Sequence, residues 1–344
     1  MHALGIPTTR SLAVVTTGEA VYRDTQLDGA VLTRVAASHI RVGTMQWAAA
    51  HQDRDALQAL ADYTLARHYP QLAAAPEPYI ALFDAILERQ ARLIARWQLV
   101  GFIHGVMNTD NMALSGETID YGPCAFMDRY DPMTVFSSID SGGRYAYANQ
   151  PPIAHWNLAR LAEAMVPLFD GDLDRAVERA TAGLDRFPAL FEEYWLEGMR
   201  AKLGLFTAED GDKALADDLF GWMHDRSADF TNTFVSLTLR RPVGAAAPAD
   251  PAFDAWHRRC MERRARQPQS SAEAESLMRR HNPAVIPRNH HVEAALQAAT
   301  GDDDLSVTER LLDVLATPYD HDRAPGPFCA PAPDARPYRT FCGT

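Results

Sequence analysis

A long amphipathic helix is the clearest element that the hydrophobic pattern predicts. It begins after Pro76 and Pro78 and ends at Val100-Gly101, where the helical spacing of apolar residues stops. Its apolar positions, which fall on one face, are Ile80, Phe83, Leu87, Ile94 and Trp97. The helical spacing starts at about residue 51, and another helix is expected to open at Pro151.

The first 45 residues have the pattern of strands instead. β-branched and apolar residues predict strands over 11–16, 20–23 and 31–36, with a turn at Thr17-Gly18 and a further turn signal at Asp28-Gly29. Beyond Pro151 the pattern is mostly helical to about residue 316, apart from an Ala/Pro/Gly-rich surface loop over 242–251. The last 20 residues hold five prolines, which predicts an extended tail.

These elements predict an α+β fold with unequal parts. A strand-containing region covers residues 1–50, a helical region covers 51–320, and a Pro-rich extended tail covers 321–344. The chain has 344 residues, of which 47% are hydrophobic and 23% charged, as is typical of a soluble globular protein. A net charge of −12 without any basic run argues against a nucleic-acid partner.

The sequence shows no targeting signal and no cysteine pattern that points to a particular function. No apolar run approaches the ~20 residues that a membrane span needs, and the first residues lack the pattern of a signal peptide, so we expect a cytoplasmic protein that does not enter a membrane. The four cysteines are too scattered for a disulfide framework or a zinc site. Cys342 lies in the predicted tail, where a thiol would be accessible to redox chemistry or be an ordinary free thiol.

The candidate chemistry lies just after the long predicted helix. The stretch from His104 to Asn111 is followed by a predicted apolar hairpin, residues 112–119 with its turn at Ser115-Gly116, and then by Asp120-Tyr121-Gly122. Kinase-like enzymes arrange a catalytic loop, two short strands and an Asp-aromatic-Gly turn in this order. The pattern therefore indicates a kinase-like fold, with most of a helical larger lobe and an incomplete strand-containing smaller lobe.

Three side chains of this stretch have the chemistry for nucleotide transfer. The amide oxygen of Asn111 and the carboxylate of Asp120 are oxygen ligands that Mg²⁺ or Mn²⁺ accepts. Asp110 stands beside Asn111 and is the candidate general base. Asx residues are also common in ordinary loops, so the residues alone leave a plain turn open as an alternative. Arg34 and Arg41 could bind phosphate, because a guanidinium can form two hydrogen bonds to it. Their spacing alone, however, favours the interpretation that both are solvated surface arginines.

The chain resembles the selenoprotein O (SelO, YdiU) family in several motifs that occur in order. They are GIPTTR, TRVAASHIR, GVMNTDNMALSGETIDYGP, GGRYAYANQP with the following WNLARLAEAM, NPAVIPRNH, and the C-terminal RTFCGT. The resemblance implies a kinase-like enzyme that binds ATP in a flipped orientation. Such an enzyme transfers AMP to Ser, Thr or Tyr hydroxyls of proteins and releases pyrophosphate.

The resemblance also assigns roles to particular residues. Asp110 matches the proton acceptor, Asn111 and Asp120 match the metal ligands, with Asp120 close to the nucleotide, and Arg34 and Arg41 match nucleotide-contacting arginines. Ordinary kinases carry the catalytic Asp directly after the His-Gly pair, where this chain has Val106. The family shares that change, which supports AMP transfer over phosphorylation.

The chain departs from the family pattern in its strand-containing region. The family pattern has a Gly-rich phosphate loop, a Lys and its Glu partner upstream of GIPTTR, whereas here GIPTTR starts at Gly5 and the first Lys is Lys202. We therefore expect a truncated family member, with exposed strand edges and apolar surface, whose activity by itself is greatly reduced or lost. The alternatives are a phosphotransferase of the aminoglycoside-kinase type, against which Val106 argues, and a non-catalytic pseudokinase remnant that acts as a binding module.

Overall fold

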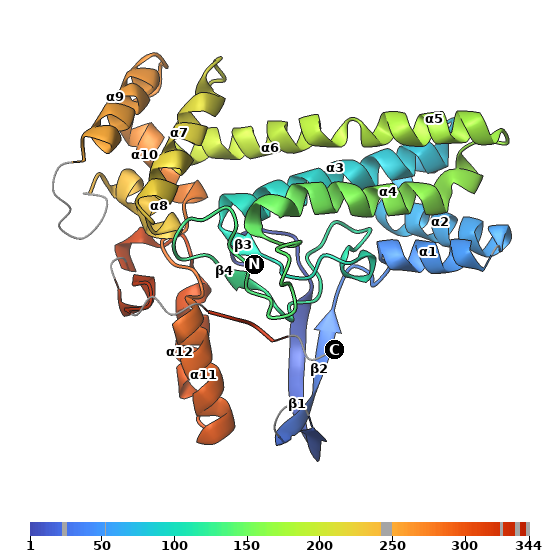
Figure 1. The fold of residues 1–344 in the computed structure, drawn as a ribbon, viewed down its shortest axis with the longest axis horizontal. Helices are drawn as coiled ribbons and strands as arrows, with labels where there is room; N and C mark the ends of the chain where they lie inside the picture. Colours follow the sequence, from blue (N-terminus) through green and yellow to red (C-terminus); the bar gives the residue numbers. More distant parts are fainter. Residues whose placement is uncertain (23–25, 52, 242–249, 324–325, 334–337, 342–344) are drawn as a thin grey trace.

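The computed structural model describes residues 1–344 except 23–25, 52, 242–249, 324–325, 334–337 and 342–344. The described part is α+β and mostly helical, with two small two-stranded sheets, as Figure 1 shows. Its α-helices are α1 Val42–Ala50, α2 Arg54–His68, α3 Pro78–Leu99, α4 Gln150–Phe169, α5 Leu173–Leu184, α6 Phe187–Lys202, α7 Asp212–Asp225, α8 Phe230–Leu239, α9 Pro251–Ala265, α10 Ser271–His281, α11 Asn289–Gly301 and α12 Ser306–Leu315.

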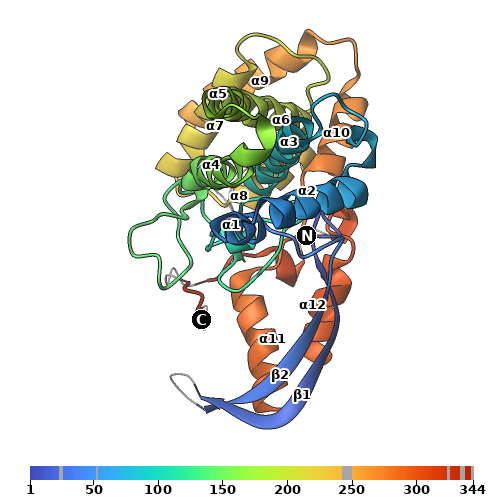
Figure 2. The ribbon, with the colours of Figure 1, turned by 90° about the vertical axis from the view of Figure 1, so that its right-hand side faces the viewer.

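The first two strands form an antiparallel ribbon that projects from the helical body (Figures 1 and 2). They are β1 Arg10–Tyr22 and β2 Gln26–Val35. The turn predicted at Thr17-Gly18 is wrong, because both residues lie inside β1. Gly18 has a positive φ of 73°, and the strand register shifts between Thr16 and Ala20, so the turn-forming residues make a bulge within one strand. Arg23, the predicted end of the second strand, lies outside the described residues.

The ribbon exposes apolar side chains on both of its faces. Val14 pairs with Leu32 on one face and Val15 with Val31 on the other. All four are more than half exposed, with relative accessibilities of 67%, 55%, 60% and 57%. The apolar exposure expected from the sequence is therefore present in the ribbon.

Helical structure begins earlier than predicted. Helix α1 starts at Val42, not at about residue 51, and α2 follows from Arg54. The N-terminal end of α1 is fixed by Arg41, whose backbone N–H donates to the Thr44 hydroxyl at 3.1 Å. Val42 and Met45 are fully buried. Tertiary burial stabilises this short helix, whose sequence alone gives only a weak helical signal.

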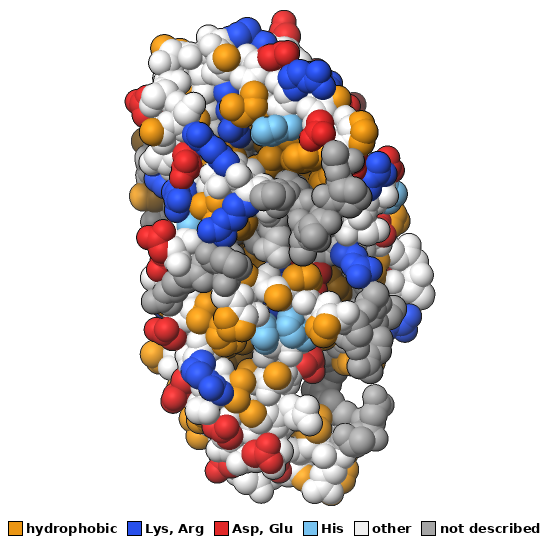
Figure 3. All heavy atoms as spheres, turned by 90° about the vertical axis from the view of Figure 1, so that its left-hand side faces the viewer, with side chains coloured by type: hydrophobic (Ala, Val, Ile, Leu, Met, Phe, Trp, Pro, Cys, Tyr) orange, Lys and Arg blue, Asp and Glu red, His pale blue; other side chains and the backbone are white. Residues whose placement is uncertain are grey.

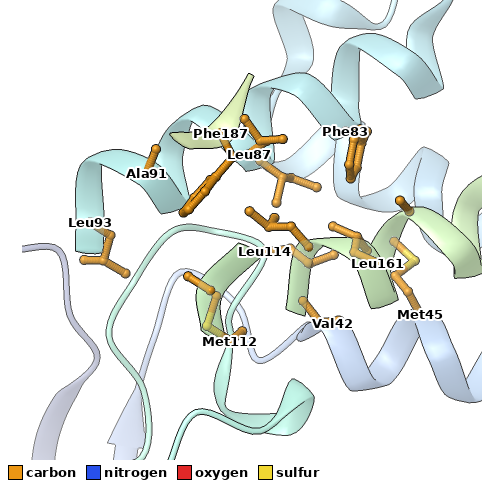
Figure 4. Close-up of a cluster of buried hydrophobic side chains, with 14 of the residues drawn as sticks. Val42, Met45, Phe83, Leu87, Ala91, Leu93, Met112, Leu114, Leu161 and Phe187 are labelled. Atoms are coloured by element: carbon orange, nitrogen blue, oxygen red, sulfur yellow. The ribbon is translucent and has the colours of Figure 1, made fainter. Parts of the chain in front are cut away.

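Helix α3 confirms the long helix predicted from the sequence. It runs over Pro78–Leu99, starts with Pro78 in its first turn, and buries one face. Helix α4 also begins as predicted, with Pro151 in its first turn. Figure 4 shows where these helices meet α1, with Met45 and Val42 facing Leu161 of α4 and Leu87 of α3 nearby. This shared core is the base on which the candidate site rests.

The C-terminal third is helical to Leu315, as predicted. Acidic and basic side chains are intermingled on the face shown in Figure 3. The described part of the predicted tail includes two 3-10 turns, His321–Arg323 and Pro327–Cys329, so it is not extended throughout. None of the helices that the structure describes is long and apolar enough to cross a membrane.

Candidate functional site

The predicted catalytic loop lies directly after α3. The chain leaves the helix at Gly101, forms β3 Phe102–Ile103, which pairs with β4 Ala125–Phe126, and then enters the loop at His104. Gly105 has a positive φ of 84°, and a Cβ at this position would lie 2.6 Å from the carbonyl oxygen of Pro123. The site needs glycine here, because any side chain would separate the loop from the segment after Asp120.

Buried hydrogen bonds fasten the loop to the segment that carries Asp120. The His104 ring donates from Nε2 to the carbonyl oxygen of Ile119 at 2.8 Å, and the His104 backbone N–H donates to Oε1 of Gln150 at 2.9 Å. Burial lowers the pKa of His104, which favours the neutral imidazole. The loop, the residue before Asp120 and the start of α4 are thereby held as one unit.

Asn111, a predicted metal ligand, is buried and its amide is oriented by a hydrogen bond. It closes the short 3-10 helix Thr109–Asn111 and is only 6% exposed. Its Nδ2 donates to the carbonyl oxygen of Val106 at 3.1 Å, which orients the amide. Its Oδ1 is buried and accepts no hydrogen bond from any residue that the structure describes. A buried amide oxygen without a donor is costly unless a cation or another donor binds to it.

Asp110 and Asp120 differ from Asn111 in exposure. Asp110 is exposed, although it is the chain neighbour of buried Asn111, so the two side chains lie in different surroundings. Asp120 is half-buried and has a positive φ of 64°, a strained backbone conformation for a residue with a side chain. Strain of this kind is found where a functional position fixes the backbone.

The metal ligands that this site could offer are few. Among the residues that the structure describes, there is no group of three or more His, Cys, Asp or Glu side chains able to hold a metal ion. An Asn and an Asp do not make a complete protein cage, but Mg²⁺ is commonly bound by one or two protein oxygens together with phosphate oxygens and waters. The set therefore fits a divalent cation that arrives with a polyphosphate.

The hairpin predicted over 112–119 is wrong in its pairing. The turn exists, since the backbone N–H of Gly116 donates to the carbonyl of Ala113 at 3.1 Å, but the two arms pair with other segments. Ala113 forms a bridge with Arg41, and Thr118 forms a bridge with Thr8. Both predicted family motifs at the N-terminal end, GIPTTR and the segment ending in Arg41, thus add backbone to this site.

The two arginines of the prediction lie in different settings. Nη1 of Arg41 donates to the main-chain carbonyl of Asp110 at 2.8 Å, so Arg41 contacts the predicted catalytic loop directly. Arg34 lies near the end of β2, opposite Ser11, and is half-buried. Within the described ranges Arg34 makes no hydrogen bond or ion pair. The structure brings Arg41 to the loop and leaves Arg34 on the ribbon.

Sequence reasoning missed two residues that support the loop. The Tyr145 hydroxyl donates to Oδ1 of Asn108 at 2.6 Å, and Nδ2 of Asn157 donates to the carbonyl of Met107 at 2.8 Å. Tyr145 comes from the GGRYAYANQP motif and Asn157 from the WNLARLAEAM motif. The motifs were visible in the sequence, but nothing in their spacing indicated that they contact the catalytic loop.

The C-terminal tail reaches the same region. The Thr340 hydroxyl donates to the carbonyl of Pro123 at 2.7 Å, beside Cys124. Burial raises the pKa of the Cys124 thiol to about 12, so this sulfur stays protonated and is a poor nucleophile at neutral pH. Cys342, for which the sequence left redox chemistry open, lies outside the described residues.

Comparison with known proteins agrees with the motifs. Residues 1–316 match the family described as protein adenylyltransferase SelO. The chain is 59% identical over 346 residues to a protein nucleotidyltransferase YdiU of Halalkalibacterium halodurans, and 56% identical over 345 residues to one of Bacillus cytotoxicus. Each match covers 100% of this chain and 70% of the relative.

Proposed function

Because the chain belongs to the SelO family of protein adenylyltransferases, we propose that its site transfers AMP from ATP to Ser, Thr or Tyr hydroxyls of proteins. The proposal includes a protein-kinase-like arrangement, in which the loop after α3 and the Asp120 turn form the catalytic centre. Asp110 acts as the general base, and Asn111 and Asp120 hold Mg²⁺ or Mn²⁺.

One observation supports this assignment most directly. Oδ1 of Asn111 is buried and has no hydrogen-bond donor among the described residues, while the Nδ2 of the same amide is fixed on Val106. The Ile119 carbonyl is held by His104, which fixes the backbone that leads into Asp120. An oriented amide oxygen without a donor is a suitable ligand for a hard cation, and Asp120 is proposed to supply the second oxygen.

The proposed chemical step is a displacement at the α-phosphorus of ATP. The acceptor hydroxyl oxygen bonds to the α-phosphorus of ATP, the bond from that phosphorus to the bridging oxygen breaks, and pyrophosphate leaves with that electron pair. The carboxylate of exposed Asp110 accepts the hydroxyl proton. A bound divalent cation would supply neutralisation of the phosphate charge.

Arg41 and Arg34 are proposed to contact the nucleotide. Arg41 is already next to the loop, since its guanidinium donates to the carbonyl of Asp110 through Nη1. Its remaining N–H groups can donate hydrogen bonds to a phosphate oxygen, because a guanidinium has five N–H donors. Arg34 on β2 has no partner within the described ranges, which leaves its donors available.

Two measurements test the proposed function. The first is calorimetric binding of ATP in the presence of MnCl₂ to this chain and to variants with Asn111→Ala and Asp120→Asn. We expect saturable binding that weakens about 10-fold or more in each variant, because a metal ligand is lost. The result that would overturn the proposal is binding that is equal in all three proteins.

The second measurement follows the label from ATP. With label on the α-phosphate, AMP transfer labels the acceptor protein, whereas label on the γ-phosphate leaves as pyrophosphate. Transfer of γ-label to the acceptor would contradict the proposed reaction and indicate a phosphotransferase.

A further inference from the structure

A large groove lies outside the candidate site, on the helical body. It has a volume of about 910 Å³ and is partly open to solvent. Its walls come from the start of α4, one face of α6, one face of α7, and the segments around Tyr130 and Tyr147. This volume is within the range of ~300–1,000 Å³ found for ligand sites. The residues assigned to nucleotide transfer do not line it.

The groove is lined by aromatic rings and prolines. Rings of Tyr130 and Phe220 lie with centroids 4.9 Å apart, and Trp195 lies 5.9 Å from Phe220. Phe187 continues the wall along α6. The prolines that line the groove are Pro132, Pro151, Pro152 and Pro188. Flat, rigid walls of this kind bind extended ligands at a low cost in side-chain entropy.

Two hydrogen-bonding groups of the groove have no partner in the part of the chain that the structure describes. They are the indole Nε1–H of Trp195 and the hydroxyl of Tyr130, both on residues that line the groove. Burial, with the nearby charge of Asp217, raises the pKa of Tyr130 to about 12, so its hydroxyl keeps its proton and can donate. Two residues of this apolar lining therefore carry a donor that no described residue engages.

The donors favour an extended peptide over a helical one. The carbonyl groups of an α-helix are already bonded within the helix, whereas those of a polyproline II segment are all free to accept. Aromatic-lined grooves recognise proline-rich segments for this reason and because the polyproline II conformation is already formed before binding.

The charge at the rim of the groove favours a basic partner. Asp217 is paired with Lys213 at 2.9 Å, and the charges of Asp217 and Glu192 both raise the pKa of Lys213. Glu192 also lines the groove, is exposed, and forms no ion pair within 4 Å in the described part of the chain, so the groove has two carboxylates for one lysine. Glu193 and Glu197 are further exposed carboxylates on α6. An Arg or Lys of the ligand would find Glu192 beside the aromatic wall.

We propose that this groove binds a proline-rich segment of a partner protein, in the polyproline II conformation and with a basic residue at one end. The rings of Tyr130, Trp195 and Phe220 form its apolar floor. The indole N–H and the phenol hydroxyl donate to carbonyls of the segment, and Glu192 pairs with its basic residue. The proposal concerns an interaction surface and does not depend on the nucleotide chemistry proposed above.

Fluorescence anisotropy with the whole chain tests the proposal. The probe is a labelled peptide, Arg-Pro-Leu-Pro-Pro-Leu-Pro, and the comparison peptide replaces every Pro by Ala at the same charge. We expect the proline peptide to bind at least about 10-fold more tightly, because the alanine peptide must lose more conformational entropy on binding. Equal binding of the two peptides, or the absence of binding by the proline peptide, would overturn the proposal.

Single substitutions locate the binding to the groove. Trp195→Phe keeps an aromatic ring and removes one donor, so we expect about 2- to 10-fold weaker binding. Glu192→Gln should weaken binding and reduce its dependence on salt, whereas Glu193→Gln, a neighbouring exposed position outside the groove lining, should leave both unchanged. Melting temperatures confirm that each variant is folded. Unchanged binding by both groove variants would place the peptide elsewhere and contradict the proposal.

Discussion

His104 and Ile119 are joined by a 2.8 Å hydrogen bond from the imidazole Nε2–H to the main-chain carbonyl. The two residues are 15 positions apart, and the bond is fully buried. Ile119 directly precedes Asp120, so His104 fixes the backbone that carries a proposed metal ligand. The His-Gly pair at the start of the loop thus acts through position, not through chemistry of its own.

Replacing His104 by Phe should therefore weaken both stability and metal binding. The variant keeps a ring in the core but leaves the Ile119 carbonyl without a donor, which costs about 1–3 kcal/mol in the free energy of unfolding. Loss of a group that orients a metal ligand should lower Mn²⁺ affinity in the presence of ATP about 10- to 100-fold. Urea unfolding and calorimetry measure the two effects. The matched control is His51→Phe at an exposed position, which should change neither.

Substitutions at Asp110 and Asn111 should affect catalysis and ATP binding separately. Asp110→Asn removes the proposed base and keeps the shape of the side chain, so turnover should fall about 100-fold or more while ATP binding with Mn²⁺ stays within about 2-fold. Asn111→Ala should instead reduce ATP binding, because the variant loses the buried Oδ1 of Asn111, which has no donor among the described residues and is proposed to bind the metal. Turnover and calorimetry of both variants decide the assignment. Equal loss of binding in the two variants would contradict these separate roles.

Because of Lys202, the free energy of unfolding should change with pH in the alkaline range. Its ammonium group is buried, has no counter-ion among the residues that the structure describes, and lies 3.9 Å from the ring centroid of Phe234; burial lowers its pKa to about 7. The unfolded chain, with a pKa near 10.5, binds more protons between these two values. The free energy of unfolding should therefore rise as the pH increases from about 7 to about 10.5.

Lys202→Met should remove this dependence. Because Met needs no proton loss on burial, the variant should be more stable at pH 7 by at least about 1 kcal/mol and show a flatter pH profile. Chemical unfolding at pH 7, 8, 9 and 10 measures both. Lys213→Met, at an exposed lysine in a surface pair, is the control and should keep the slope of the parent protein. A pH profile of the variant as steep as that of the parent would contradict the lowered pKa of Lys202.

Arg288 should be the most sensitive charged residue of the C-terminal part. It is 1% exposed, and its Nη1 lies 2.6 Å from Asp128 and 2.8 Å from Asp229. Arg288→Met leaves two carboxylates without their cation, which should cost about 3–5 kcal/mol in the free energy of unfolding. Arg259→Met, at an exposed ion pair with Asp218, should cost less than about 1 kcal/mol. Parallel urea titrations compare the two variants.

Local signals in the sequence determined much of the architecture. The spacing of apolar residues and the prolines at 78 and 151 predicted α3 and α4, because helix periodicity and first-turn proline depend only on neighbours along the chain. The order of the loop, the turn and Asp120-Tyr121-Gly122 also indicated the candidate site, since those residue types have a chemistry of their own.

Pairing between distant segments could not be predicted from local sequence signals. The arms around Gly116 suggested a hairpin, but Ala113 pairs with Arg41 and Thr118 with Thr8. Two segments with the right alternation can pair with each other or with other strands, and the choice depends on what surrounds them. The same holds for Thr17-Gly18, where turn-forming residues became a bulge inside β1.

By itself, then, the sequence determined which residues can do the chemistry, because a carboxylate or an amide oxygen has its ligand properties wherever it stands. Only the tertiary structure decided which of them are held in place. It buried Asn111 and left its Oδ1 without a donor, exposed the adjacent Asp110, and fixed the approach to Asp120 through His104. Burial and hydrogen bonding depend on segments far apart in the chain, and those meet only in the folded protein.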